Sequence, residues 1–230
     1  SSSLSSVVPT QPESPELSLL ADSLVTRPSV SPTPLWEAPI SEVLNARAGA
    51  QLSGAWKLLL LGDGSPTRHL HLLTGRPVTI DLIAMGPEQE LRRPGPGPDA
   101  AQARPAEVAE LVPPLLLRQV WLRCNGQALA WAESWWNQAE AEESLRDRQQ
   151  PIWLSLTSER AELFREVDGL AQVNADWLER GFAAQGPFWS RHYRFFRQGR
   201  ELTVIREVFS PALERWLGPS QRDADLHKVL

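Results

Sequence analysis

Two pairs of alternating apolar segments, each joined by a dipeptide that ends in glycine, constrain the fold of this chain most strongly. The first pair is Leu116–Cys124 and Gln127–Trp135 around Asn125-Gly126, and the second is Arg191–Arg197 and Arg200–Phe209 around Gln198-Gly199. Asn-Gly favours a type I′ turn, which returns one strand alongside the other. The sequence therefore predicts two β-hairpins. With helices between and before them, it predicts an α+β fold with an antiparallel sheet of about six strands.

The remaining periodicity predicts further elements around the hairpins. Helices are expected at Ile40–Asn45, Ala55–Leu61, Ser158–Val167 and Ala175–Phe182, and a strand at Val78–Met85. The segment Pro151–Leu156 lies between the two hairpins.

Composition shifts along the chain predict one folded domain between two irregular ends. Residues 1–34 are rich in Ser and Pro and are expected to form a disordered arm. Residues 35–218 are expected to form a single domain, with a flexible internal loop over 88–104 where Arg-Arg-Pro-Gly-Pro-Gly-Pro excludes regular structure. The polar tail, residues 219–230, is expected to fray.

Bulk properties exclude several classes of protein. A net charge of -5 argues against a nucleic-acid partner, and apolar runs such as Leu58–Leu61 are too short for stable membrane insertion. A single cysteine excludes an internal disulfide framework and a multi-cysteine metal site. Because the N-terminus shows no basic or apolar leader, we expect a cytoplasmic protein, acting as a monomer on a small molecule.

Two charged side chains of opposite sign occupy positions where the strand period predicts hydrocarbon. Alternation places Arg118 on the face of Val120 and Leu122, and Glu207 on the face of Ile205. A charge on an apolar face is costly unless it is paired or kept for a ligand. A guanidinium and a carboxylate that converge on an apolar cavity suit a small aromatic acid with a polar group at its far end. Both are therefore candidate catalytic residues.

Pairing across the hairpins leaves two interpretations of these charges open. If the Asn-Gly dipeptide alone forms the first turn, Arg118 lies opposite Glu133 and the two can form a purely structural ion pair. A slip of one residue would remove that pair. The same rule places Glu207 opposite Ser190 in the second hairpin, so a basic partner for Glu207 must come from elsewhere.

Other polar residues are weaker candidates. Arg191 and Arg68 could meet a second carboxylate of the ligand. His69 and His71 have the His-x-His spacing of some metal sites, but no third ligand is nearby in the sequence, so no metal or other cofactor is expected. His192 is expected to be a structural histidine.

Five segments, in their order and spacing, are similar to a known family. They are Gly62-Asp-Gly-Ser-Pro-Thr-Arg-His69, Leu117-Arg-Gln-Val-Trp-Leu-Arg-Cys-Asn-Gly126, Gln150-Pro-Ile-Trp153, Gly186-Pro-Phe-Trp-Ser-Arg191 and Glu207-Val-Phe-Ser-Pro211. Together they resemble the chorismate lyase family, and more closely its cyanobacterial branch, from about Lys57 to Leu217. The resemblance implies helices packed on an antiparallel sheet, with flap loops over a buried ligand pocket.

The resemblance also implies an activity and roles for residues. The family converts chorismate into 4-hydroxybenzoate and pyruvate without a cofactor. Arg118 would hold the ring carboxylate, Glu207 would face the 4-hydroxyl group, and the backbone N–H of Ile152 would help hold the carboxylate. Ser65 and Pro66 lie where the other flap would meet the ligand. Proline has no N–H, so a neighbour would donate there or the loop would shift.

Three functions follow from these observations. The first is a lyase whose 4-hydroxybenzoate feeds quinone synthesis, plastoquinone in the cyanobacterial branch. In it, Glu207 orients the 4-hydroxyl group, accepts the C4 proton or relays a proton to the departing enolpyruvate. The second is a non-catalytic module of the same fold that binds a small aromatic acid. The third is an interaction protein that uses residues 1–34 as a docking tail.

Overall fold

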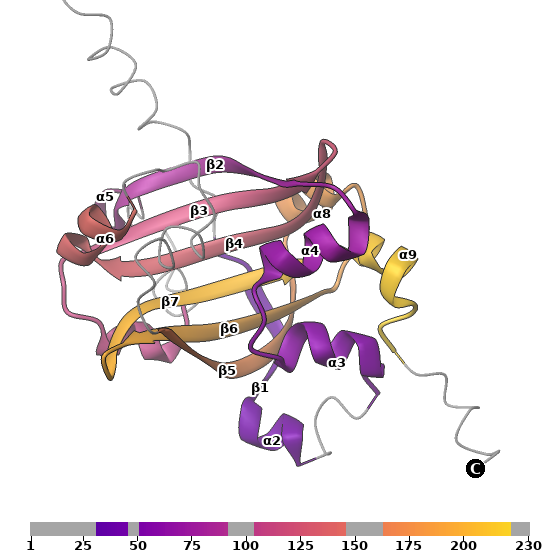
Figure 1. Ribbon diagram of the computed structural model, residues 1–230, viewed down its shortest axis with the longest axis horizontal. Coiled ribbons are helices and arrows are strands. Elements are labelled where there is room, and N and C mark those ends of the chain that lie inside the picture. The colour runs from indigo at the N-terminus through magenta and orange to yellow at the C-terminus, as the bar shows by residue number, and fades with distance from the viewer. Residues whose placement is uncertain (1–30, 46–50, 92–103, 146–162, 222–230) are drawn as a thin grey trace, which may run out of the picture.

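The computed structural model describes residues 31–45, 51–91, 104–145 and 163–221, and they build a seven-stranded antiparallel sheet with helices packed against it (Figure 1). The strands are β1 (Thr33–Pro39), β2 (Val78–Pro87), β3 (Leu115–Cys124), β4 (Gln127–Asn137), β5 (Leu163–Asn174), β6 (Phe188–Arg197) and β7 (Arg200–Phe209). Their order in space is β1-β5-β6-β7-β4-β3-β2. The predicted α+β fold with an antiparallel sheet is confirmed.

Short helices cover both faces of the sheet. They are α2 (Ile40–Leu44), α3 (Gly54–Leu61), α4 (Pro66–Thr74), α5 (Glu88–Leu91), α6 (Gln138–Ser144), α8 (Asp176–Phe182) and α9 (Glu214–Leu217), with 3₁₀ turns η1 (Ala106–Glu110) and η2 (Pro211–Leu213). We call the face that carries Arg118 and Glu207 the front face and the other the back face. Within the described ranges, no helix is long and apolar enough to cross a bilayer.

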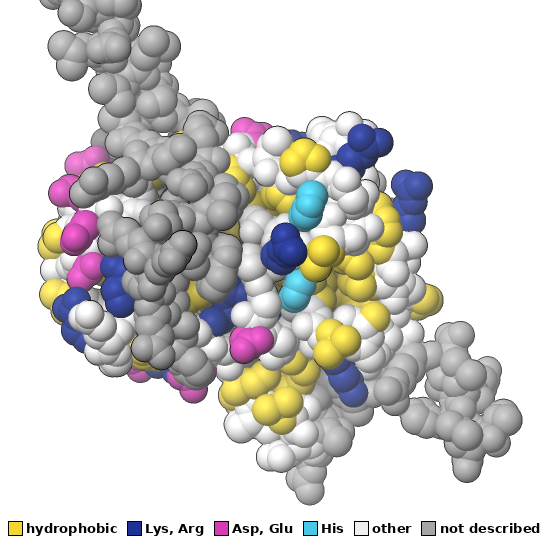
Figure 2. Space-filling model, in the orientation of Figure 1, with side chains coloured by type: hydrophobic (Ala, Val, Ile, Leu, Met, Phe, Trp, Pro, Cys, Tyr) yellow, Lys and Arg dark blue, Asp and Glu magenta, His cyan; other side chains and the backbone are white. Residues whose placement is uncertain are grey.

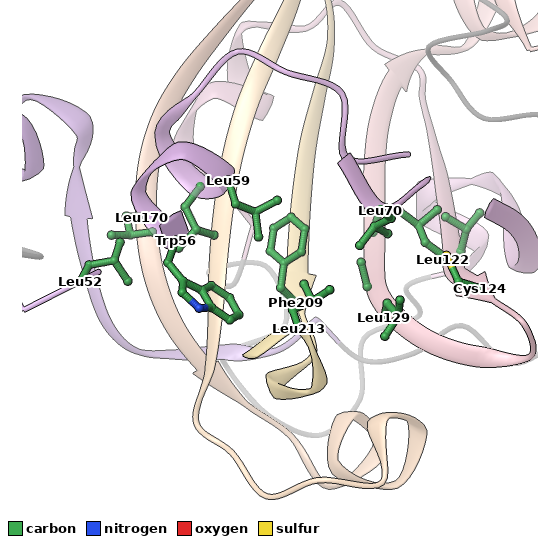
Figure 3. Close-up of a cluster of buried hydrophobic side chains, with 14 of the residues drawn as sticks. Leu52, Trp56, Leu59, Leu70, Leu122, Cys124, Leu129, Leu170, Phe209 and Leu213 are labelled. Carbon is green, nitrogen blue, oxygen red and sulfur yellow. The ribbon is translucent and has the colours of Figure 1, made fainter. Parts of the chain in front are cut away.

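The front face is covered by α3 and α4, which lie across the sheet in Figure 1. Trp56 and Leu59 of α3 and Leu70 of α4 pack with Leu122 and Phe209 of the sheet in one buried cluster (Figure 3). Burial of these large apolar side chains is the main force that holds the two helices in place. Hydrophobic side chains remain at the surface over α2 and α3 (Figure 2), where Leu44 and Leu58 are exposed.

The back face is covered by η1 and α8. Val108 and Leu111, within η1 and directly after it, pack with Trp135 of β4, while Leu178 and Phe182 of α8 pack in the cluster that contains Trp131 of β4. Because alternate residues of β4 point to opposite faces, this strand contributes to the core on both sides.

Both predicted hairpins are present, and their turns have the expected backbone conformation. Asn125 and Gly126 have φ values of 51° and 80°, and Gln198 and Gly199 have φ values of 53° and 72°. Positive φ at both central residues defines the type I′ turn, which matches the right-handed twist of the strands.

The register of both hairpins differs by one residue from the prediction, because each contains a β-bulge close to its turn. The pairing skips Leu129 in β4 and Leu202 in β7, and both leucines are buried in the core. Beyond the bulges, Arg118 lies opposite Ser134 instead of Glu133, and Glu207 lies opposite Arg191 instead of Ser190.

Three further elements differ from the prediction. The helix α5, Glu88–Leu91, begins the segment 88–104 that was expected to be a loop. The expected helix Ser158–Val167 is wrong over its last residues, because Leu163 begins β5. β1 was not expected and begins at Thr33, inside the segment assigned to the arm. It contains Pro34 and Pro39 and lies at the edge of the sheet, where prolines are tolerated because one side of the strand needs no ladder partner. The segment Pro151–Leu156 lies outside the described residues, as do most of the arm, loop and tail.

Candidate active site

Arg118 of β3 and Glu207 of β7 both point to the front face, and both line one small cavity. Val120 and Leu122 of β3, Ala132 of β4, Ile205 of β7 and Ile80 of β2 supply apolar walls. The polar lining consists of Ser65, Thr67, Arg118, Arg165, Tyr193 and Glu207. The structure thus brings together a predicted cation and a predicted carboxylate in apolar surroundings.

The cavity is small. Its volume is about 40 Å³, whereas ligand pockets typically measure roughly 300 Å³ or more and one water occupies roughly 30 Å³. An aromatic acid therefore needs more room than this volume offers.

Glu207 is held by two donors on its own sheet. Arg191 Nε donates to Glu207 Oε1 at 2.6 Å, and the Tyr193 hydroxyl donates to Oε2 at 3.0 Å. The expectation that no basic residue lies directly opposite Glu207 is therefore wrong, because the bulge at Leu202 places Arg191 there. Each carboxylate oxygen keeps a further lone pair that a ligand can use.

Arg191 connects Glu207 to the segment between α3 and α4. Its guanidinium donates to the carbonyl oxygens of Leu59, Gly62 and Gly64 at 3.0, 2.9 and 3.3 Å, and only 1% of the residue is exposed. Among the described residues, Arg191 is not part of the cavity lining. The contact of Arg191 with a second carboxylate of the ligand stays a prediction.

Arg165 is a second cation at the cavity that the sequence did not reveal. It lies on β5, donates to the carbonyl oxygen of Asp63 at 2.9 Å and stacks 4.7 Å from the ring centroid of Tyr193. The helix expected over Ser158–Val167 concealed it. When the same segment is treated as a strand, Arg165 lies on the same face as Val167. This alternation is the signal in the sequence that could have predicted a strand and revealed Arg165.

Glu133, the alternative partner of Arg118, lies on the back face. Its Oε1 accepts from Nε and from a terminal nitrogen of Arg206 at 2.9 and 2.6 Å, and its Oε2 accepts from the Gln119 amide at 3.1 Å. The predicted cross-strand pair of Arg118 and Glu133 is therefore wrong, because the bulge at Leu129 shifts Glu133 to the other side of the sheet.

The predicted flap residues fall partly within the described structure. Ser65 and Pro66 line the cavity where α4 begins. The Ser65 hydroxyl accepts from the Arg68 backbone N–H at 3.5 Å and lies 2.8 Å from that of Thr67, and Pro66 is the first helical residue. Ile152 lies outside the described residues.

Burial shifts the pKa values of two titratable groups near Glu207. Burial, together with the negative charge of Glu207, raises the pKa of Tyr193 above its ordinary value, so its hydroxyl stays protonated and donates. Burial and the charges of Arg191 and Arg165 lower the pKa of His69, so its ring is held neutral. His71 is exposed, with Nδ1 2.8 Å from the Arg76 carbonyl oxygen.

Comparison with known families identifies the family of this chain. The model of the Rv2949c-like chorismate pyruvate-lyase family matches residues 60–217. The chain belongs to this family. The resemblance inferred from about Lys57 to Leu217 is confirmed, and the match contains every described residue that lines the cavity.

Two curated proteins and one solved structure are also similar to this chorismate pyruvate-lyase family member. The uncharacterized protein ycf21 of Cyanophora paradoxa is 30% identical over 160 residues, which cover 69% of this chain and 78% of the relative. Its counterpart from Porphyra purpurea is 30% identical over 165 residues and covers 70% and 83%. The effector domain of PhnF from Mycobacterium smegmatis is 15% identical with a TM-score of 0.47, covering 66% of this chain and 92% of that domain.

Proposed function

We propose that this protein is a chorismate lyase that eliminates pyruvate from chorismate to give 4-hydroxybenzoate. The observation that carries the proposal is the presence of two guanidinium groups, of Arg118 and Arg165, and one carboxylate, of Glu207, around a single apolar cavity. Membership of the chorismate pyruvate-lyase family supports it.

The charges of the cavity complement those of chorismate. Chorismate carries a carboxylate on its ring and another on its enolpyruvyl side chain. In this proposal Arg118 holds the ring carboxylate through a planar, bidentate contact, and Arg165 meets the enolpyruvyl carboxylate. The apolar walls, such as Val120 and Ile205, enclose the ring, and Glu207 accepts from the 4-hydroxyl group. The flap residues Ser65, Pro66 and Ile152 complete the enclosure.

The elimination needs positioning more than covalent help. The C3–O ether bond breaks, the C4 hydrogen leaves as a proton, and the C–H electron pair becomes part of the aromatic ring. The departing enolpyruvate takes up a proton to become pyruvate. Aromatisation drives the reaction, so a dry cavity that orients the substrate supplies much of the rate. Glu207 is the group placed to accept or relay the proton.

Arg191 acts in this scheme as a positioning residue. It fixes Glu207 on one side and three backbone carbonyls of the α3–α4 segment on the other. Charge-assisted bonds of this kind are strong and directional. Arg191 thereby couples the orientation of the carboxylate to the position of the wall that contains Ser65.

The product has a further fate in this proposal. A phenolic acid such as 4-hydroxybenzoate can serve as the ring precursor of a quinone, plastoquinone in a cyanobacterial setting. We place the enzyme in the cytoplasm as a monomer that needs no cofactor for this reaction.

The test is direct turnover of chorismate. Purified protein treated with a chelator is mixed with chorismate, and 4-hydroxybenzoate and pyruvate are quantified by chromatography. Equal amounts of both products are expected. Arg118→Ala should lower kcat/KM by about 100-fold, since a lost charge-assisted pair costs about 3 kcal/mol. Arg123→Ala is the matched control, because Arg123 lies on the same strand but is not part of the cavity lining: its side chain contacts the exposed Asp81, the Gly126 carbonyl oxygen and the ring of Trp121.

The same assay separates the alternatives. Tight binding of 4-hydroxybenzoate by a protein that forms no products would replace the lyase with a binding module. Equal losses in Arg118→Ala and Arg123→Ala would remove Arg118 from the site.

A further inference from the structure

We propose that Glu107, Asp168 and His192 form a binding site for a divalent transition-metal ion on the back face of the sheet. Each residue offers one ligand atom, and these atoms lie within 4.8 Å of one another. His192 Nε2 and Glu107 Oε2 are 3.1 Å apart, close to the separation of two ligands that bind one zinc ion at roughly 2.0–2.1 Å.

The site is separate from the cavity of the proposed lyase. His192 precedes Tyr193 on β6 and lies opposite Arg206, whereas Tyr193 and Glu207 face the front. The two sites therefore lie on opposite sides of the same sheet, and neither depends on the other.

The local backbone is shaped to hold these side chains. The pairing of β5 with β6 skips Asp168, so this residue forms a bulge between Val167 and Gly169. Bulges redirect side chains and are common beside functional sites. The φ angle of Gly169 is not in the positive range, so the backbone conformation alone does not require glycine. A Cβ there would lie 2.4 Å from Cε1 of His192, so glycine provides the space for the imidazole ring.

The atoms proposed as ligands keep bonding capacity that a cation could use. Within the described residues, His192 Nε2 and Glu107 Oε2 are buried atoms that lie 3.1 Å apart as a close pair, without a well-aligned hydrogen bond. A carboxylate oxygen keeps lone pairs beyond such a contact. A bound cation would satisfy both atoms at once.

The charge around the site favours a cation. Asp168 accepts from Arg194 at 2.8 and 2.7 Å, which fixes its orientation. The same arginine also contacts Glu110 at 3.0 Å and Glu166 at 3.6 Å. One guanidinium therefore serves three carboxylates, and Glu107 adds a fourth negative charge. Asp168 keeps lone pairs for a metal while Arg194 orients it from outside the site.

The site opens on a second cavity, with a volume of about 490 Å³. Glu107, Asp168, His192 and Arg206 line it. Three protein ligands leave a coordination position free for water or a small anion, and this position would face the cavity. One imidazole and two carboxylates suit zinc and neighbouring first-row ions better than calcium or magnesium.

The test is metal binding by the full chain after chelator treatment. Zinc is titrated by calorimetry, and cobalt(II) is followed by its visible absorption, which reports coordination by nitrogen and oxygen. One equivalent should bind. Glu107→Gln and His192→Gln should each weaken binding by more than about tenfold.

Two controls make the result decisive. His71→Gln and His227→Gln remove the imidazoles of a surface helix and of the tail and should bind zinc as the wild type does. Circular dichroism without metal shows that each variant is folded. Less than one equivalent bound by the wild type would overturn the proposal. So would wild-type affinity in Glu107→Gln and His192→Gln.

Discussion

Glu207 sits in a hydrogen-bond arrangement that glutamine can reproduce without the charge. The amide oxygen of a glutamine can accept from Arg191, and its NH₂ group can donate to the Tyr193 hydroxyl, which then acts as acceptor. Glu207→Gln therefore isolates the charge and proton-accepting capacity of the side chain from its role as an anchor.

We expect Glu207→Gln to lower kcat on chorismate by about 100-fold while KM changes little, because a positioned general base contributes roughly 10²–10⁴ in rate. Steady-state kinetics at several pH values check this. Retention of most of the activity would exclude an obligatory proton transfer through Glu207 and leave it with an orienting role.

At the scale of elements, the hairpins show where sequence reasoning succeeds and where it stops. The alternation and the turn dipeptides predicted β3, β4, β6 and β7, and the same alternation placed Arg118 and Glu207 each on the apolar face of its own strand. The register beyond each turn was wrong by one residue, because it depends on where the core accepts an extra buried leucine, Leu129 or Leu202. The packing of segments that are distant in the sequence determines the position of each bulge, and no local sequence pattern predicts it.

The two arginines around Glu207 illustrate the same limit. Arg191 could be recognised as a candidate, but its partner could not, since one residue of slippage exchanges Ser190 for Arg191 opposite Glu207. Arg165 was hidden because its segment was interpreted as a helix, although as a strand it alternates regularly from Arg165 to Val167.

The pair of Glu133 and Arg206 joins β4 to β7 through the back face, and its loss should be costly. We expect Arg206→Met to destabilise the protein by about 3 kcal/mol, because the buried Glu133 carboxylate loses this guanidinium. Combining it with Glu133→Gln should recover much of the loss. Urea denaturation of the single and double variants measures both effects.

The same variants test the assignment of faces. Chorismate turnover per folded molecule should stay near the wild-type value in the double variant, because the pair faces away from the cavity. A loss of turnover comparable to that of Arg118→Ala would mean that Glu133 acts on the front face.

For the molecule as a whole, Glu201 introduces a pH dependence of stability. Burial, with a hydrogen bond to Glu110 and the negative charges of Glu110 and Asp168, raises the pKa of Glu201 from 4.5 to about 8, and Arg194 only partly opposes this. Between these values the folded state keeps the proton that the unfolded state releases. The contribution of Glu201 to stability is therefore present below about pH 4.5 and is lost as the pH rises towards 8.

We expect the thermal midpoint of the wild type to fall more steeply between pH 5 and pH 8 than that of Glu201→Gln, which has no proton to lose in this range. Thermal unfolding followed by circular dichroism in matched buffers gives both slopes. Parallel slopes would show that Glu201 titrates in the folded state as it does in the unfolded chain.

The small volume of the front cavity has a practical consequence for the search for inhibitors. A space of about 40 Å³ offers a rigid docking calculation little room for a drug-like molecule. Screening in solution, and crystals grown with the compound already present, are the routes that this architecture favours.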